Sequence, residues 1–236
     1  MRKFYTLVTI AALALPALAQ NMIMVVHTND GQTVKFNTDN VTEITFEDGE
    51  DIPDSRAIDL GLTSGTKWAS MNLGADSESA RGYFFAWADT TYKVTYSETS
   101  YDFEGRVIDD IAGTEYDAAK HLWGNKWSVP TLEQWEELLR ETSPQATSVG
   151  GASGLILRSK TNGNSIFLPF LGQVQDTYIV NPEYAWYWSS TQGEWNGNNN
   201  VAYYFFGAAS YNRIGTTNKR VGLQIRAVMN APKEAE

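Results

Sequence analysis

The chain has 236 residues, of which 28 are Asp or Glu and 18 are Lys or Arg, and its formal net charge is −10. A chain this acidic repels the phosphate backbone of nucleic acids and anionic lipid surfaces, so neither is expected as a partner. It contains no cysteine, which excludes disulfides, thiolate metal sites, cysteine nucleophiles and a lipid anchor on an N-terminal cysteine.

Residues 1–19 have the three parts of a secretory signal peptide. Arg2-Lys3 gives a basic start, Leu7 to Leu15 is an apolar run too short to span a bilayer, and Ala17-Leu18-Ala19 fits the small-residue cleavage rule. We predict export, with Gln20 as the first mature residue and the protein secreted, at the cell surface or in the periplasm. Without the two basic residues the mature charge is −12, from 16 basic and 28 acidic residues. No other window is long and apolar enough to cross a membrane.

A small β-hairpin unit is predicted over residues 20–50. The β-type runs 22–28 and 33–36 flank Asn29-Asp30-Gly31, and Asp-Gly between two such runs is a strong hairpin signal. A third run, 41–46, follows. The unit is too small to carry a core, so we expect it to pack on the rest of the chain or on a neighbour.

Two later segments have helical character. Thr114 to Trp123 is one, with Thr114 or Asp117 as its N-cap. The other begins at Thr131, where Thr131 and Gln134 form a capping-box pattern. Its apolar residues fall on one face and its glutamates are interpreted as a solvated face. The apolar residues are Leu132, Trp135, Leu138 and Leu139, and the glutamates are Glu133, Glu136, Glu137 and Glu141.

The rest of the chain is typical of short strands between turns. These strands are expected at 165–170, 185–190, 201–206 and 223–229. With the two helices they predict one α+β domain over 56–229, with many loops. A linker is expected at 51–55 and an acidic tail at 230–236.

Several stretches of this domain, taken in order, resemble the Fibrobacter succinogenes major paralogous domain of exported Bacteroidetes proteins. Asp59-Leu60-Gly61-Leu62-x-Ser64-Gly65-Thr66-Lys67-Trp68-Ala69 and Asn72-Leu73-Gly74-Ala75 resemble its opening, which Gly82-Tyr83-Phe84-Phe85-Ala86-Trp87 continues. Trp127-Ser128-Val129-Pro130-Thr131-x-x-x-Trp135 is similar to the central helix start shared with the formylglycine-generating-enzyme-like group. The pattern is completed by Asn164-Ser165-Ile166-Phe167-Leu168-Pro169, Tyr187-Trp188-Ser189-Ser190 and Gly222-Leu223-x-Ile225-Arg226-Ala227-Val228.

This resemblance implies a C-type-lectin-like fold: two helices, a mainly antiparallel sheet, long loops and a C-terminal strand that closes the sheet. The unit at 20–50 is similar to a short leader often found ahead of such domains. The family often carries Cys where this chain has Met71, so a family disulfide or thiol is missing. The formylglycine-generating relatives oxidise their substrate with their own cysteines, so that chemistry does not carry over.

A recognition site is predicted near the C-terminus. From Glu183 to Arg220, 18 of 38 residues are Tyr, Ser, Gly or Asn, which is the composition of binding paratopes. Trp186 and Trp188 are expected in the core, but Trp195 lies in a turn-like run where it can stack on a sugar or fill a partner's pocket. Residues 211–220 are expected to form a second polar loop of the same site; the alternative is a pair of solvated loops without a ligand. The candidate ligand-binding residues are Trp195, Asn196, Asn198, Asn199, Tyr211, Asn212, Arg213, Asn218 and Arg220.

The segment from Glu183 to Arg220 is also similar to the variable C-terminal part of retroelement-diversified proteins of the same fold. We therefore predict an exported, non-catalytic, adhesin- or lectin-like protein that recognises a glycan or a protein. A structural role in a cell-surface assembly is the second hypothesis, and the sequence sets no oligomeric state. A glycan-active enzyme with paired carboxylates is disfavoured because the glutamates of the second helical segment are interpreted as its solvated face. No Gly-rich phosphate loop or nucleophile elbow is present either.

No cofactor is expected. His27 and His121 lie far apart in the sequence, which argues against zinc. Calcium stays an alternative that is not favoured: Glu194, Asn196 and Asn198 offer some oxygen ligands, but the paired signatures of calcium-dependent sugar binding are absent.

Overall fold

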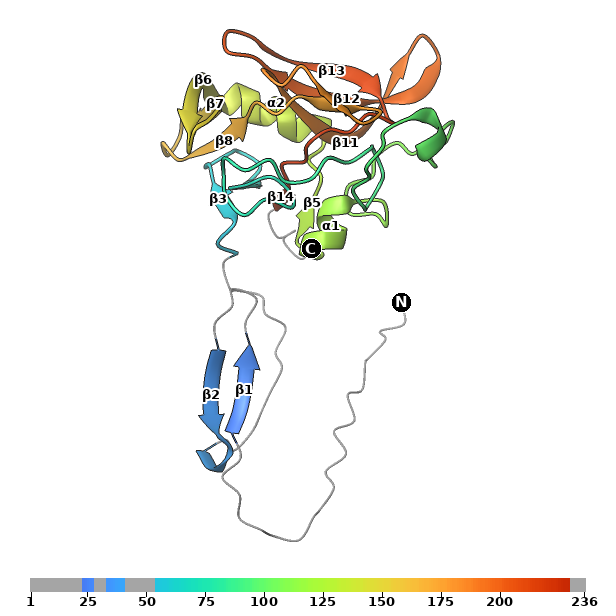
Figure 1. Cartoon of the computed structure of the whole chain (residues 1–236). Coiled ribbons are helices and arrows are strands. Elements are labelled where there is room, and N and C mark those ends of the chain that lie inside the picture. The colour runs from blue at the N-terminus through green and yellow to red at the C-terminus, as the bar shows by residue number, and fades with distance from the viewer. Residues whose placement is uncertain (1–22, 28–32, 41–53, 230–236) are drawn as a thin grey trace, which may run out of the picture. The chain divides into compact units, whose positions relative to one another are not determined.

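A computed structural model describes residues 23–27, 33–40 and 54–229 of the chain (Figure 1). The chain separates into two compact units, Met1–Ile52 and Pro53–Glu236. The predicted signal peptide, the third β-type run, most of the predicted linker and the acidic tail lie outside the described residues. In the part that is described, no helix is long and apolar enough to cross a membrane.

The first unit contains the predicted hairpin. β1 (Ile23–His27) pairs antiparallel with β2 (Thr33–Asn37), and a 3-10 turn, η1 (Thr38–Asn40), follows. Alternation along this register puts four apolar side chains on one face. These are Met24, Val26, Val34 and Phe36, of which the last three are exposed. The hairpin therefore carries an apolar face that nothing covers within its described residues.

The second unit is mainly antiparallel β with two short α-helices, as predicted. Its elements are β3 (Ala57–Asp59), β4 (Lys67–Ala69), η2 (Glu98–Ser100), α1 (Ala118–Trp123), β5 (Trp127–Ser128), α2 (Leu132–Glu141), β6 (Thr142–Val149), β7 (Ala152–Ser159), β8 (Ser165–Pro169), β9 (Gln173–Gln175), β10 (Tyr178–Val180), β11 (Ala185–Trp195), β12 (Asn198–Gly207), β13 (Asn212–Asn218) and β14 (Val228–Met229). The sheets have the strand orders β3-β4-β14-β5, β6-β7-β8, β11-β12-β13 and β10-β9.

Both helices begin at capping residues that the sequence indicated. Asp117, not Thr114, caps α1: its carboxylate accepts the N–H groups of Ala119 and Lys120 and also holds that of Val129. For α2 the capping box is confirmed, since the Thr131 hydroxyl accepts the Gln134 N–H and the Gln134 side chain accepts that of Thr131.

The glutamates of α2 do not all form a solvated face. Glu137 is buried, and its carboxylate accepts both the N–H and the hydroxyl of Ser64 at 2.8 and 2.6 Å. One turn later, Glu141 accepts the N–H and the hydroxyl of Thr63 at 2.9 and 3.0 Å. The prediction is wrong at these two positions because the turn between β3 and β4 lies against this side of the helix.

The strand expected at 223–229 is also shorter than predicted. Only Val228–Met229 forms β14, which pairs with both β4 and β5. Upstream of it, Leu223 and Gln224 make isolated bridges to Phe85 and Tyr187. This part of the chain runs between two different neighbours and so never forms a continuous ladder.

Tryptophans fill the two large clusters of the core. The first cluster includes Trp87, Trp127 and Trp188, and the second includes Trp68, Trp135 and Leu157. Trp188 is buried, as expected, whereas Trp186 is half-buried against the first cluster. Large rigid side chains thus supply the stability that disulfides cannot supply here.

Arg226 is fully buried and joins three parts of the domain. Its Nε and Nη2 atoms donate to Asn72 Oδ1 at 3.0 and 2.7 Å. Its Nη1 donates to the Ala69 carbonyl at 3.1 Å, and Nη2 also donates to the Phe167 carbonyl at 2.8 Å. The guanidinium therefore satisfies carbonyl groups that would otherwise be buried without partners.

We predict that Arg226→Met lowers the free energy of unfolding by about 3 kcal/mol or more, because it leaves several buried acceptors without donors. Urea denaturation followed by tryptophan fluorescence measures the change. The matched control is Arg140→Met, since the Arg140 side chain is 64% exposed and its ion pair with Glu141 lies at the surface. Equal effects of the two substitutions would contradict a structural role for the buried guanidinium.

Candidate functional site

The β11–β12 hairpin presents Trp195 to solvent. Asn196 and Gly197 join the two strands, and both have positive φ angles, 49° and 75°, as a two-residue type I′ turn requires. Trp195 pairs with Asn198 across this turn and is 63% exposed. The tryptophan is thus exposed, as expected, although it is the last residue of a strand and not part of the turn.

The second polar segment is a strand and not the expected loop. Asn212–Asn218 forms β13, which pairs antiparallel with β12 from Gly207 opposite Asn212 to Val201 opposite Asn218. Its β-branched residues Ile214, Thr216 and Thr217 favour this conformation once β12 is available as a partner. The prediction of a loop over 211–220 is therefore wrong for most of its length.

This register divides the nine predicted residues into two groups. Asn218 lies beside Val201, three positions from Asn198, whereas Asn212 lies at the far end of β12. The two ends of β13 are separated by about 20 Å, at about 3.3 Å per strand residue. One group is Trp195, Asn196, Asn198, Asn199, Asn218 and Arg220, and the other is Tyr211, Asn212 and Arg213. The turns that end β11 and β12 accordingly lie at opposite ends of the sheet (Figure 1).

Two residues of the first group, Asn218 and Arg220, line a polar groove of about 460 Å³. It is lined by Tyr96, Ser97, Glu98, Thr99, Gln175, Asp176, Thr217, Asn218, Arg220 and Val221. Nη1 of Arg220 lies 3.5 Å from Oε2 of Glu98. Hydroxyls, amides, carboxylates and a guanidinium thus face one space, which suits a ligand rich in hydrogen-bonding groups.

The walls of this groove are held by buried contacts. Tyr96 and Asp176 exchange two backbone hydrogen bonds, of 2.8 and 3.0 Å. The Tyr96 hydroxyl donates to the Phe84 carbonyl, and burial raises the pKa of this hydroxyl, which keeps it protonated. Gly222 packs against the Tyr96 ring, where an added Cβ would lie only 3.0 Å from ring atoms. A ligand therefore meets walls that are already in place, which lowers the entropic cost of binding.

Two side chains that the sequence did not single out anchor the hairpin next to the groove. Asn200 donates to the Glu104 carboxylate at 2.5 Å and accepts the Gly105 N–H at 2.6 Å. Lys219 is fully buried, and its Nζ atom donates to Gln192 Oε1 at 2.5 Å and to the Arg106 carbonyl at 3.1 Å. The contacts of Asn200 with Glu104 and Gly105, and that of Lys219 with Arg106, join segments about a hundred residues apart, which local sequence patterns cannot reveal.

The burial of Lys219 has an electrostatic consequence. Its Nζ atom lies 4.4 Å from the centre of the Trp87 ring. Desolvation lowers the pKa of Lys219 from 10.5 to about 8, against the opposing charge of Glu104. The folded domain thus holds a lysine that loses its proton more easily than one in the unfolded chain.

Metal-binding residues do not gather in the described part of the chain. Over 23–27, 33–40 and 54–229, no group of three or more His, Cys, Asp or Glu side chains could hold a metal ion. Of the oxygen donors considered for calcium, Asn198 Oδ1 accepts the N–H of Asn200 at 2.8 Å. Glu194 and Asn196 lie exposed at the hairpin end.

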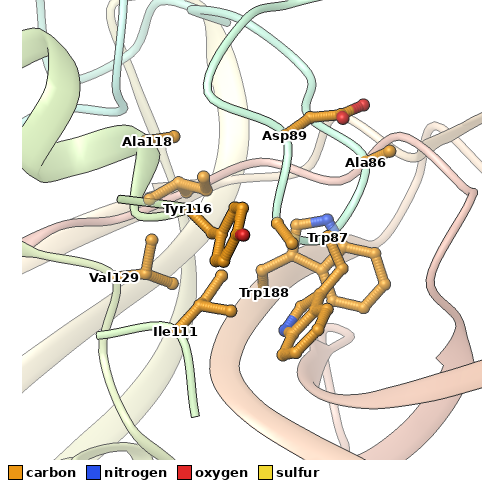
Figure 2. A pocket seen from close by; sticks show the side chains of 10 residues that line it. Ala86, Trp87, Asp89, Ile111, Tyr116, Ala118, Val129 and Trp188 are labelled. Carbon is orange, nitrogen blue, oxygen red and sulfur yellow. The ribbon is translucent and has the colours of Figure 1, made fainter. Parts of the chain in front are cut away.

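A second hollow lies in the core and not at the surface (Figure 2). Its lining includes Trp87, Ile111, Val129 and Trp188, and it is too small for a water molecule. Figure 2 shows the Asp89 carboxyl group directed away from the two indole rings. That carboxylate is 2.7 Å from the Lys93 ammonium group. The hollow is a gap in the packing and offers no room for a ligand.

No family model, curated protein or solved structure matches this chain. The resemblance to the major paralogous domain family therefore stays a prediction from the sequence motifs. The function has to be argued from the groove and the hairpin themselves.

We predict that the contribution of Lys219 to stability rises with pH. Between pH 8 and 10.5 the unfolded chain keeps the lysine proton that the folded domain releases, so the unfolded state binds more protons and the free energy of unfolding increases. Urea denaturation from about pH 7 to about pH 10 should show wild type gaining stability relative to Lys219→Met. Lys67→Met, at an exposed position, is the control for the removal of a surface lysine. A flat difference for Lys219→Met would show that the lysine is not desolvated.

Proposed function

We propose that this protein is an exported, non-catalytic recognition protein that binds a glycan or another protein at the hairpin end of the β11-β12-β13 sheet. One observation carries the proposal: an exposed tryptophan, Trp195, stands beside a tight turn, at the end of the sheet where Asn218 and Arg220 line a polar groove. Export is supported by the signal-peptide pattern of residues 1–19.

The side chains suit recognition because they combine stacking area with hydrogen bonding. Trp195 offers a flat apolar surface that can stack on a sugar ring or fill a partner's pocket. A second aromatic residue, Tyr178, is 72% exposed and pairs with Gln175 in the groove wall. Glu98, Asp176 and Arg220 supply charged acceptors and donors to sugar hydroxyls or peptide groups.

The proposal includes a C-type-lectin-like fold of the major paralogous type. Three features support it: the sequence motifs, the presence of two helices, and the place of β14 between β4 and β5. The last feature agrees with a C-terminal strand that closes the sheet formed by the start of the domain.

A structural role in a cell-surface assembly is the second candidate. It is favoured by the uncovered apolar face of the β1–β2 hairpin, where Val26, Val34 and Phe36 are exposed. Isolated two-stranded hairpins are at best marginally stable in water, so such a face favours a packing partner. Size-exclusion chromatography with and without residues 20–50 separates this role from simple recognition.

We predict that Trp195→Ala weakens ligand binding by about 2 kcal/mol, or about 30-fold in Kd, because it removes the aromatic anchor of the site. A glycan array and a panel of cell-surface proteins identify the ligand, and titration calorimetry then measures the change. Tyr92→Ala is the matched control, since Tyr92 is 59% exposed but stacks on Tyr83 far from β11 in the sequence.

Both substitutions should leave the thermal midpoint almost unchanged, because both side chains are exposed. If the array and the panel give no binding while a set of glycoside hydrolase substrates is turned over, the recognition function is wrong. Equal loss of binding in the two variants would place the site elsewhere.

A further inference from the structure

β13 is an edge strand with one open side. In the order β11-β12-β13 it pairs only with β12, and among residues 54–229 no other strand pairs along its outer edge. The ladder runs without a shift over the seven residues of β13. Most proteins blunt such an edge with proline, a bulge or a covering segment, because it can pair with another chain.

Two backbone hydrogen bonds at the ends of this ladder show which groups face outward. Ala208 N donates to Tyr211 O at 2.7 Å, and Lys219 N donates to Asn200 O at 2.9 Å. In an antiparallel pair, hydrogen-bonded positions alternate with positions whose backbone groups point away. Arg213, Gly215 and Thr217 therefore bond to β12, whereas Asn212, Ile214 and Thr216 point their N–H and C=O groups outward.

In the β6-β7-β8 sheet, by contrast, the outer edges of β6 and β8 are not free to pair with another strand. On β6, the bond from Lys160 N to Glu141 O sets the same alternation and makes Pro144 an outward position, where a proline leaves no N–H to offer. On β8, the outward carbonyls of Phe167 and Pro169 accept bonds from Arg226 and the Tyr187 hydroxyl. No such group bonds to the outward side of Ile214 or Thr216 within the described residues.

The charges along β13 favour a foreign segment over a second copy of this chain. Two copies that each carry a net charge of −10 repel one another. The open edge itself has Arg213 near one end and Arg220 just beyond the other. A short segment carries far less charge than a second copy of the chain, and these two arginines attract its acidic groups locally.

We propose that the outer edge of β13 binds an extended polypeptide segment of a partner protein by strand addition. The segment pairs with the backbone of Asn212, Ile214 and Thr216, and one of its ends enters the polar groove beside Asn218 and Arg220. This inference rests on the proposed recognition function and identifies the ligand as protein. It also explains why the candidate residues lie at both ends of β13: an extended ligand reaches from one group to the other.

The test uses the mature chain and a display library of linear random peptides about twelve residues long, which exceeds the span of β13. For a selected peptide, amide hydrogen exchange measured by NMR should show new protection at Ile214 and Thr216. The amides of Arg213, Gly215 and Thr217 are already protected by β12 and should change little. N-methylation along the peptide should weaken binding at least tenfold at every second residue.

Thr216→Pro removes one outward N–H without removing a bond to β12, and it should weaken peptide binding at least tenfold. The matched control is Ser148→Pro, at an outward position on the edge of β6, which should have no effect. Circular dichroism checks the fold of both variants; if Thr216→Pro does not fold, the exchange and N-methylation patterns decide.

Three results would overturn strand addition. The first is a peptide that binds without protecting the amides of Ile214 and Thr216. The second is self-association through β13 that depends on protein concentration, and the third is a library that yields no binder. If a glycan binds in a Trp195-dependent manner while no peptide does, the recognition function stands and only the strand-addition inference fails. If neither a glycan nor a peptide binds, both the recognition function and the strand-addition inference are wrong.

Discussion

The fold depends on a guanidinium that is removed from water. Arg226 is fully buried, and burial lowers its pKa, although an arginine stays protonated in proteins. Its charge is stabilised by hydrogen bonds to carbonyl oxygens of Asn72, Ala69 and Phe167. These acceptors lie about 150 and 60 residues away from Arg226 in the sequence. One side chain therefore holds β4 and the residues just after it, β8 and the C-terminal segment together.

This fixed interior lets the late strands carry polar side chains at the surface. The indole rings of Trp135 and Trp188 donate to the carbonyls of Trp188 and Phe85, so even the aromatic core is oriented by hydrogen bonds. The β11–β12 hairpin is then held close to its turn by Asn200 and Lys219. Its tip needs no further support, so Trp195 can stay exposed without a loss of stability.

Local signals were readable in the sequence, and long-range ones were not. The capping box at Thr131 and the Asn-Gly turn after Trp195 act within a few residues, so their patterns predict structure directly. β13 was missed because its polar residues resemble a loop until β12 lies beside it. Likewise, helical spacing cannot show that a distant turn lies over Glu137, and no local pattern joins Ser97, Gln175 and Asn218 in one groove.

The open edge of β13 has to be considered together with the net charge of the chain. β6 has Pro144 at an outward position and β8 has its outward carbonyls satisfied, so these edges cannot recruit another strand. β13 has neither device among the described residues, and an open regular edge is an aggregation hazard for a protein. A net charge of −10 reduces that hazard, since it keeps copies of the chain apart. The acidic composition and the open edge are therefore compatible with each other, and the edge can stay accessible to a ligand of different charge.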